Sequence, residues 1–247
     1  MVSNQLANTQ RLTGLGKWRN NMFEKMRGTW TKAIQPLVVR MGDLDPSVLT
    51  WTSLFVSLIG FYILSAAEIS TNGAIMIVVA VILVLVAGVL DALDGALARH
   101  QGTDGAYGDF LDHTIDRIVD VGLLVAIGMN TAFVSSLNAG LAAGLLTLLG
   151  SYMGTQAQSV GLDRIYGGFS RADRMIVTLV GLLVAAMQAY TGGAGIDITA
   201  YHEYFGYLLL GNNELNGMTA ALAISAWGGV YTFLVRFNST RKQLLEL

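Results

Sequence analysis

Six aspartates in this chain fall in or beside apolar stretches that are long enough to cross a membrane. A carboxylate inside a bilayer costs about 3 kcal/mol or more, so we expect these side chains to serve a function. All of them lie at one end of two neighbouring stretches: Asp91, Asp94, Asp109, Asp112, Asp116 and Asp120. Their spacing therefore decides what chemistry they can do.

The spacing places these carboxylates in pairs on helix faces. Asp91 and Asp94 are three residues apart, and Asp112 and Asp116 are four apart, so each pair shares one face of a helix. A short connection joins the two helices, so both faces can point to one place. A divalent cation would relieve the repulsion, and oxygen ligands suit Mg²⁺ or Mn²⁺. Two ions about 4 Å apart could hold a phosphoryl substrate. The alternative is a polar network that only specifies packing.

Neighbouring residues fit a site for a bulky phosphorylated ligand. Gly95 follows Asp94 directly, and Gly108 lies one turn before Asp112. A residue without a side chain lets a substrate approach the backbone closely. Arg99, near the end of the first of the two helices, could pair with a phosphate.

The composition indicates an integral membrane protein. Of 247 residues, 53% are hydrophobic and 13% are charged, whereas a soluble domain has about a quarter charged residues. There is no cysteine, which excludes a disulfide framework and a thiolate metal site. The N-terminus does not have the pattern of a secretory signal peptide.

Six apolar stretches are close to or above the roughly 20 residues that a transmembrane helix needs, and the fifth is the shortest. We predict an all-α integral membrane protein with six transmembrane helices: Val48–Ala67, Gly73–Ala98, Gly108–Ile127, Leu137–Ser159, Met175–Tyr190 and Leu215–Phe237. Lysines and arginines gather in the termini and in every second connection, so we expect both termini and the acidic site to face the cytosol at the cell membrane.

The N-terminal segment has the pattern of an amphipathic juxtamembrane helix. Apolar residues recur at helical spacing between lysines and arginines: Leu15, Trp18, Met22, Met26 and Trp30. Such a helix lies in the headgroup region, although a basic tail is the alternative. We divide the chain into a cytosolic tail with the interfacial helix (1–45), a membrane domain (46–240) and a second cytosolic tail (241–247).

The stretch DALDGALARHQGTDGAYGDFLDHTID, from Asp91 to Asp116, resembles the signature of the CDP-alcohol phosphotransferase (phosphatidyltransferase) family. That signature reads D-x2-D-G-x2-A-R-x8-G-x3-D-x3-D, and every fixed position is present. DPSVLT also resembles the family's PN-x-[IL]-T entry to the first span, with Ser47 in place of the usual Asn. The resemblance extends over most of the chain.

The resemblance implies a metal-dependent enzyme of phospholipid biosynthesis that transfers a lipid phosphate group from a CDP-activated lipid to an alcohol and releases CMP. It implies a homodimer with a polar cavity open to the cytosol. Asp91, Asp94 and Asp112 would be metal ligands; Asp116 would lie close to the metals and be the general base. The residues that would cradle CDP are Gly95, Ala98, Arg99 and Gly108.

The acceptor is indicated by a second set of motifs. DHTIDRIVD, with Arg117 after the last signature aspartate, and YGGFSRADRMIV resemble the branch of phosphatidylinositol-phosphate and archaetidylinositol-phosphate synthases. On that likeness Arg117, Arg171 and Arg174 would bind the acceptor's phosphate. This likeness favours inositol phosphate as the acceptor. The alternative for Arg171 and Arg174 is that they are ordinary cytosol-facing basic residues.

One departure weakens that choice. The branch reads roughly Y-x-K-A-R-A-E at the end of the fourth span, whereas this chain reads YMGTQAQ, with Gly154 and Gln156 in place of the Lys and Arg. Gln156 could instead donate hydrogen bonds to alcohol hydroxyls, so glycerol phosphate, serine, ethanolamine and inositol stay open. The pattern is most similar to archaeal members, which would make CDP-archaeol the donor rather than CDP-diacylglycerol.

Two other classes fit the sequence poorly. A divalent-cation transporter needs polar groups across the whole membrane depth, but these acids gather at one end. An intramembrane aspartyl protease needs G-x-G-D, and the nearest match, AYGD at 106–109, lacks the first glycine. We expect the bilayer, the donor and the acceptor as partners, and no nucleic acid.

Overall fold

The computed structural model describes residues 34–163, 165, 167–193 and 195–246. The described residues form six long helices, a four-residue helix, one 3₁₀ turn and a pair of very short strands, and residues 34–41 are also helical. The long helices are α2 (Pro46–Ser65), α3 (Thr71–Gln101), α4 (Ala106–Met129), α5 (Leu137–Ser159), α6 (Arg171–Thr191) and α8 (Gly217–Leu245). The expected amphipathic helix at residues 15–30 lies outside the described residues.

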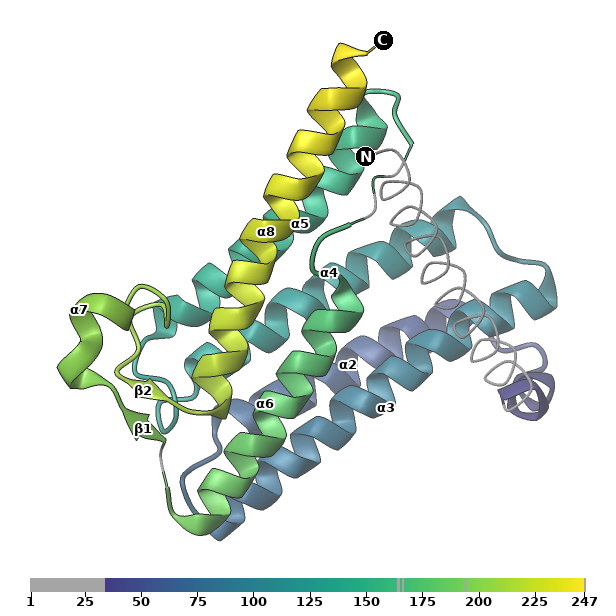
Figure 1. Ribbon diagram of the computed structural model, residues 1–247. Coiled ribbons are helices and arrows are strands. Elements are labelled where there is room, and N and C mark those ends of the chain that lie inside the picture. Colours follow the sequence, from purple (N-terminus) through teal and green to yellow (C-terminus); the bar gives the residue numbers. More distant parts are fainter. Residues whose placement is uncertain (1–33, 164, 166, 194, 247) are drawn as a thin grey trace, which may run out of the picture.

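The six long helices form a closed ring in which each helix packs against two neighbours. Around the ring, α2 contacts α3, α3 contacts α6, α6 contacts α8, α8 contacts α5, α5 contacts α4, and α4 returns to α2. Figure 1 shows α5 and α8 side by side and α6 between α8 and α3. The two halves of the chain therefore meet at two contacts of the ring, α3 with α6 and α4 with α5.

Five of these helices are long and apolar enough to cross a membrane. The exception is α4, which forms where a span was predicted but carries a run of charged side chains: Asp109, Asp112, Asp116, Arg117 and Asp120. The predicted helical membrane fold is thus confirmed, with five candidate membrane spans among the described residues where six transmembrane helices were predicted.

Two helix boundaries differ from the predicted spans by more than three residues. The predicted fifth span began at Met175, but α6 begins at Arg171, because Ser170 and Asp173 form a capping box that starts the helix in a polar turn. The last helix, α8, continues to Leu245, through residues that the sequence had placed in a cytosolic tail. Apolar composition marks the part of a helix that suits lipid, whereas caps mark where the helix begins.

At one end of the ring, buried asparagines hold the loops together, and we call this the asparagine end. It comprises residues 66–70, 130–136, 192–193 and 195–216, including β1 (Ile196–Asp197), which pairs with β2 (Glu214–Leu215), and the short helix α7 (His202–Phe205). Asn130 donates to the Leu64 and Ala67 carbonyls at 2.8 and 2.9 Å. Asn216 caps α8 and donates to the Phe133 carbonyl at 2.6 Å.

Glycines let the helix backbones touch near this same end. A Cβ placed on Gly128 of α4 would lie 2.6 Å from the Cα of Gly140 in α5, so neither position has room for a side chain. Close approach at small residues is a common way for membrane helices to pack. The opposite end of the ring, where α3 ends and α4 begins, carries the aspartates, and we call it the acidic end.

Candidate active site

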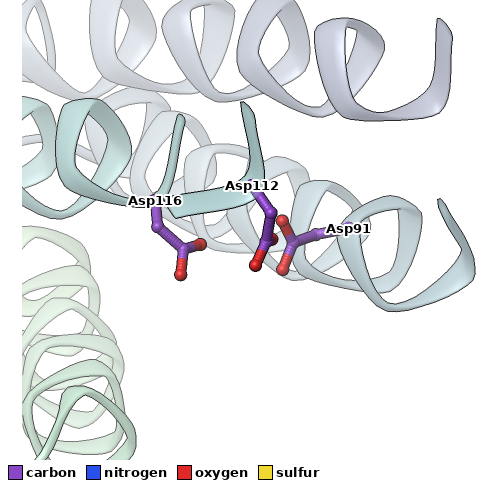
Figure 2. A group of neighbouring side chains, drawn as sticks. All are labelled: Asp91, Asp112 and Asp116. Carbon is purple, nitrogen blue, oxygen red and sulfur yellow. The ribbon is translucent and has the colours of Figure 1, made fainter. Parts of the chain in front are cut away.

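Three aspartates from two helices meet at the acidic end. Asp91 of α3 and Asp112 and Asp116 of α4 each offer one carboxylate oxygen, and these three oxygens lie within 4.8 Å of one another. Figure 2 shows the carboxylates of Asp91 and Asp112 turned toward each other, with Asp116 one turn along the same helix as Asp112. We call these residues the acidic triad.

The short connection between α3 and α4 makes this meeting possible. Gly102 ends α3 in the left-handed conformation, with φ 67°, and its backbone N–H donates to the Ala98 carbonyl. That conformation strains residues with a Cβ but not glycine. After Gly105, the chain begins α4, whose first three turns bring Asp112 and Asp116 to Asp91 of α3.

The acidic triad fits a divalent metal ion. Oxygen donors at this spacing match the ligands that hard divalent cations take, and their like charges repel unless a cation lies between them. In addition, the Oδ1 atom of Asp116 is buried and makes no hydrogen bond. This oxygen forms an ion pair with Arg171 Nη2 at 2.6 Å, but the two groups are not aligned as in a hydrogen bond. A buried anionic oxygen that accepts no hydrogen bond can coordinate a metal ion.

Asp94, the fourth expected ligand, lies beside the triad and is not part of it. Its carboxylate is buried and accepts a hydrogen bond of 2.5 Å from the Thr50 hydroxyl. Thr50 belongs to the DPSVLT segment at the start of α2, so this segment reaches the acidic face of α3. Sequence reasoning noted the motif but did not find this contact.

A cavity of about 820 Å³ opens at the acidic end between the start of α2, the end of α3 and the start of α4. Both Asp91 and Asp112 line it, together with Asp94. The residues expected to cradle the nucleotide also line it: Gly95, Ala98, Arg99 and Gly108. At Gly108 a Cβ would meet nothing within 4 Å, so the backbone there borders open space. The volume is that of a small-ligand pocket.

The arginines expected to bind the acceptor gather around Asp120, one turn beyond Asp116. Asp120 is buried and accepts from Arg171 Nε at 3.0 Å and from Arg174 Nη2 at 2.7 Å. Arg117 lies farther off, 3.7 Å from Asp120 and 3.7 Å from Asp116, and it donates to the Ser151 hydroxyl of α5 at 2.7 Å. Helices α4, α5 and α6 thus all contribute to this cluster.

Arg171 connects the acidic triad to the arginine cluster. Its guanidinium contacts Asp116 at 2.6 Å, Asp120 at 3.0 Å and Asp91 at 3.9 Å. Cations near the triad offset part of the repulsion among its carboxylates. A ligand that binds both groups would lie across Asp116.

One expectation about the acceptor residues needs adjustment. No described hydrogen bond joins Gln156 to the arginines; its side-chain oxygen accepts from the Tyr152 hydroxyl at 2.7 Å on the same helix. Asp120, three residues after Arg117, makes its shorter contacts with Arg171 and Arg174. The role of Ser151 was not predicted from the sequence, where a lone hydroxyl in an apolar helix gives little signal.

Comparison with known proteins identifies the family. The model of the CDP-alcohol phosphatidyltransferase family matches residues 44–211. Archaetidylinositol phosphate synthase of Methanothermobacter thermautotrophicus is 33% identical over 69% of this chain and 87% of its own length. The enzyme of the same name from Pyrococcus horikoshii is 34% identical over 68% of this chain and 85% of its own length.

The fold is that of solved members. The crystal structure of Mycobacterium tuberculosis phosphatidylinositol phosphate synthase with CDP-DAG bound matches with a TM-score of 0.63 at 23% identity, over 85% of this chain and 92% of that one. A second structure of that enzyme, in complex with manganese and citrate, also has a TM-score of 0.63, at 23% identity over 85% of this chain and 88% of that one. The family match, the multi-pass helical fold and the acidic triad agree: this chain belongs to the CDP-alcohol phosphatidyltransferase family and is a membrane transferase of phospholipid synthesis.

Proposed function

We propose that this chain transfers the lipid phosphate group of a CDP-activated lipid to a hydroxyl of inositol phosphate and releases CMP. The observation that carries the proposal is the place of Asp116. Its carboxylate is shared between the acidic triad, within 4.8 Å, and Arg171, at 2.6 Å, which leads to the other arginines. The proposed donor is CDP-archaeol, with CDP-diacylglycerol as the alternative.

The donor side of the site is the cavity beside α2, α3 and α4. In the proposal, Gly95, Ala98 and Gly108 let the nucleotide approach the backbone, and Arg99 pairs with a phosphate. Two divalent ions, Mg²⁺ or Mn²⁺, held by Asp91, Asp94, Asp112 and Asp116, would neutralise the pyrophosphate and the leaving CMP. The acidic triad supports this assignment for three of the four residues.

Asp116 is the proposed general base. In the proposal its carboxylate takes the proton of the acceptor hydroxyl, and the resulting oxygen attacks the lipid-side phosphorus. The bond from that phosphorus to the bridging oxygen breaks, and CMP departs with the electron pair. Asp116 suits this task because its carboxylate lies between the acidic triad, on the donor side, and the arginine cluster, on the acceptor side.

The acceptor side is the arginine cluster. Arg117, Arg171 and Arg174 place three guanidinium groups around one buried aspartate, Asp120. Arg117 and Arg171 also contact Asp116, and in the proposal metal ions at the acidic triad neutralise this carboxylate, so that the guanidinium groups can pair with a phosphate dianion. Guanidinium groups bind phosphate oxygens in a fixed fork geometry. The chemistry of this cluster favours a phosphorylated acceptor over serine, ethanolamine or free inositol. Gln156 would contact acceptor hydroxyls only after leaving Tyr152.

We also propose that the acidic end faces the cytosol at the cell membrane, with both termini on that side, and that the enzyme is a homodimer. The distribution of lysine and arginine supports the orientation. The acidic end contains the end of α3, the start of α4 and the start of α6, and these segments hold the arginines near the site.

The proposal is tested with purified protein, Mn²⁺, CDP-archaeol or CDP-diacylglycerol, and a panel of alcohols, with CMP release as the measurement. We expect inositol phosphate to give the highest kcat/KM and Asp116→Asn to lower kcat at least about 100-fold, the size of a general-base contribution. The control, Asp197→Asn, makes the same change at the asparagine end. Full activity of Asp116→Asn, or faster turnover of glycerol phosphate, would overturn the corresponding part of the proposal.

A further inference from the structure

The segment just before α6 rests on one face of α8, at a distance from the donor cavity. Residues 167–169 form this segment, and they lead directly into Ser170, the N-cap of α6. Three α8 residues contact the segment: Gly228, Thr232 and Arg236. They are spaced four apart, so they share one helix face. We call this face the α8 clamp.

Thr232 is the centre of the clamp. Its hydroxyl oxygen accepts from the Phe169 backbone N–H at 2.8 Å. Its hydroxyl hydrogen is within reach of the Gly228 carbonyl at 2.7 Å and the Phe169 carbonyl at 3.1 Å. Thr232 is buried, so a backbone N–H left without this acceptor would be poorly compensated by water.

The other two clamp residues hold the segment on either side of Thr232. The Phe169 ring covers Gly228 so closely that a Cβ there would lie 2.7 Å from the ring Cγ. Arg236 donates from Nε to the Gly167 carbonyl at 3.3 Å and from Nη1 to the Gly150 carbonyl of α5 at 3.0 Å. The clamp therefore connects the segment to two helices.

The segment itself is built for this close approach. Gly168 has φ 83°, and a Cβ there would lie 2.7 Å from the Cα of Thr232. Gly167 has φ 134°. Both positions adopt backbone conformations that residues with a side chain rarely take, so the contact with α8 is specified by the sequence on both sides.

The position of this segment fixes the first turn of α6. Ser170 and Asp173 form the capping box, and Arg171 and Arg174 follow within the same turn. Their guanidinium groups reach Asp120 at 3.0 and 2.7 Å. A shift or rotation of this turn would move both groups away from Asp120 together, because both lie on the same rigid helical turn.

We propose that the α8 clamp positions Arg171 and Arg174 and is thereby a determinant of acceptor binding. The proposal rests on the proposed function, in which these arginines hold the acceptor's phosphate. Clamp residues contact the segment and not the donor cavity, so they act as positioning residues and affect the acceptor more than the donor.

Thr232→Val tests the proposal, because it removes the hydroxyl and keeps the shape of the side chain. We expect the KM for inositol phosphate to rise roughly 5–10-fold, the equivalent of one hydrogen bond, while the KM for the CDP-lipid changes less than about twofold. Thr232→Ser keeps the hydroxyl and should restore most of the acceptor affinity. Amide hydrogen exchange at residues 169–174 should rise in the Val variant and not in the Ser variant.

Thr147→Val is the matched control. Thr147 is also buried between α5 and α8, and its hydroxyl lies 3.5 Å from the Ser225 carbonyl, away from residues 167–169. It should leave both KM values unchanged. The clamp proposal would be overturned if Thr232→Val changed the two KM values equally, or if Thr232→Ser did not restore the acceptor affinity.

The two proposals fail in different ways. If the wild-type enzyme does not use inositol phosphate, the proposed acceptor is wrong. The clamp proposal can then still be tested by hydrogen exchange and by the KM of the alcohol that the enzyme does use. If the wild-type enzyme does use inositol phosphate and Thr232→Val keeps its KM, the clamp proposal is wrong and the proposed function stands.

Discussion

The two ends of the helical ring bury polar groups in opposite ways. At the asparagine end, the Asn130 side chain donates to two carbonyls and accepts from the backbone N–H groups of Ala132 and Phe133. At the acidic end, three carboxylates face one another, and Asp116 keeps a buried oxygen without a hydrogen bond. Both ends carry buried polar atoms, but only the first satisfies them within the described part of the chain.

This difference separates the two purposes of a buried polar group. A neutral amide with all its hydrogen bonds made stabilises the fold, because its removal would leave backbone groups unpaired. Like charges held together destabilise the fold, and proteins keep such arrangements where a function requires them. Substitutions at the asparagine end should therefore change stability, and substitutions at the acidic end should change activity.

The largest effect is expected for Asp112→Asn. It should lower CMP release about 1,000-fold, because loss of a metal-holding carboxylate removes several kcal/mol of transition-state stabilisation. Its melting temperature in EDTA should be no lower than that of the wild type, because one of three repelling charges is gone. Thermal scans with and without Mn²⁺ measure this directly. A variant that is less stable in EDTA and still gains stability from Mn²⁺ would contradict the comparison.

Asn130→Ala should have the next largest effect, and it should act on stability alone. Four hydrogen bonds are lost, which we expect to lower the free energy of unfolding by about 3 kcal/mol. Thermal unfolding measures the loss, and the two KM values of the folded enzyme should match those of the wild type. Asn213→Ala, an exposed asparagine at the same end, is the control with little effect. A selective change in one KM would show that the two ends are not independent.

Asp197→Asn should have the smallest effect, although it removes a carboxylate. Hydrogen bonds from the Thr199 hydroxyl and backbone N–H lower the pKa of exposed Asp197 from its ordinary value. A lowered pKa stabilises the fold above the ordinary pKa, and the effect is lost as pH falls through the lowered one. The melting temperature of the variant should thus fall slightly below that of the wild type at neutral pH and equal it in strong acid. CMP release should stay within about twofold.

More of the structure of the acidic end than of the asparagine end could be predicted from the sequence. The spacing of Asp91, Asp112 and Asp116 within two adjoining helices brought them together as expected, because one short turn fixes the geometry. The contact of Arg174 with Asp120 joins helices that are distant in sequence, and it depends on how α6 packs in the ring. No local pattern encodes that packing.

The hydrogen bonds of Asn130 could likewise not be predicted from the sequence. This residue is the C-cap of α4 and could have been a simple cap, but its amide donates to carbonyls at the end of α2. The predicted start of α6 was late for a different reason. The turn Arg171–Arg174 is polar, and hydropathy does not register a helix that begins with arginines.

The charged surface of α4 has a consequence for how the protein enters the membrane. Each buried charge raises the cost of placing an isolated helix in lipid, and α4 carries several. The partners of these charges lie on helices that follow α4 in the chain: Arg171 and Arg174 on α6 and Ser151 on α5. We therefore expect α4 to enter the hydrocarbon core only after α5 and α6 have been synthesised, so that the helix bearing the acidic site inserts together with the side chains that pair with its charges.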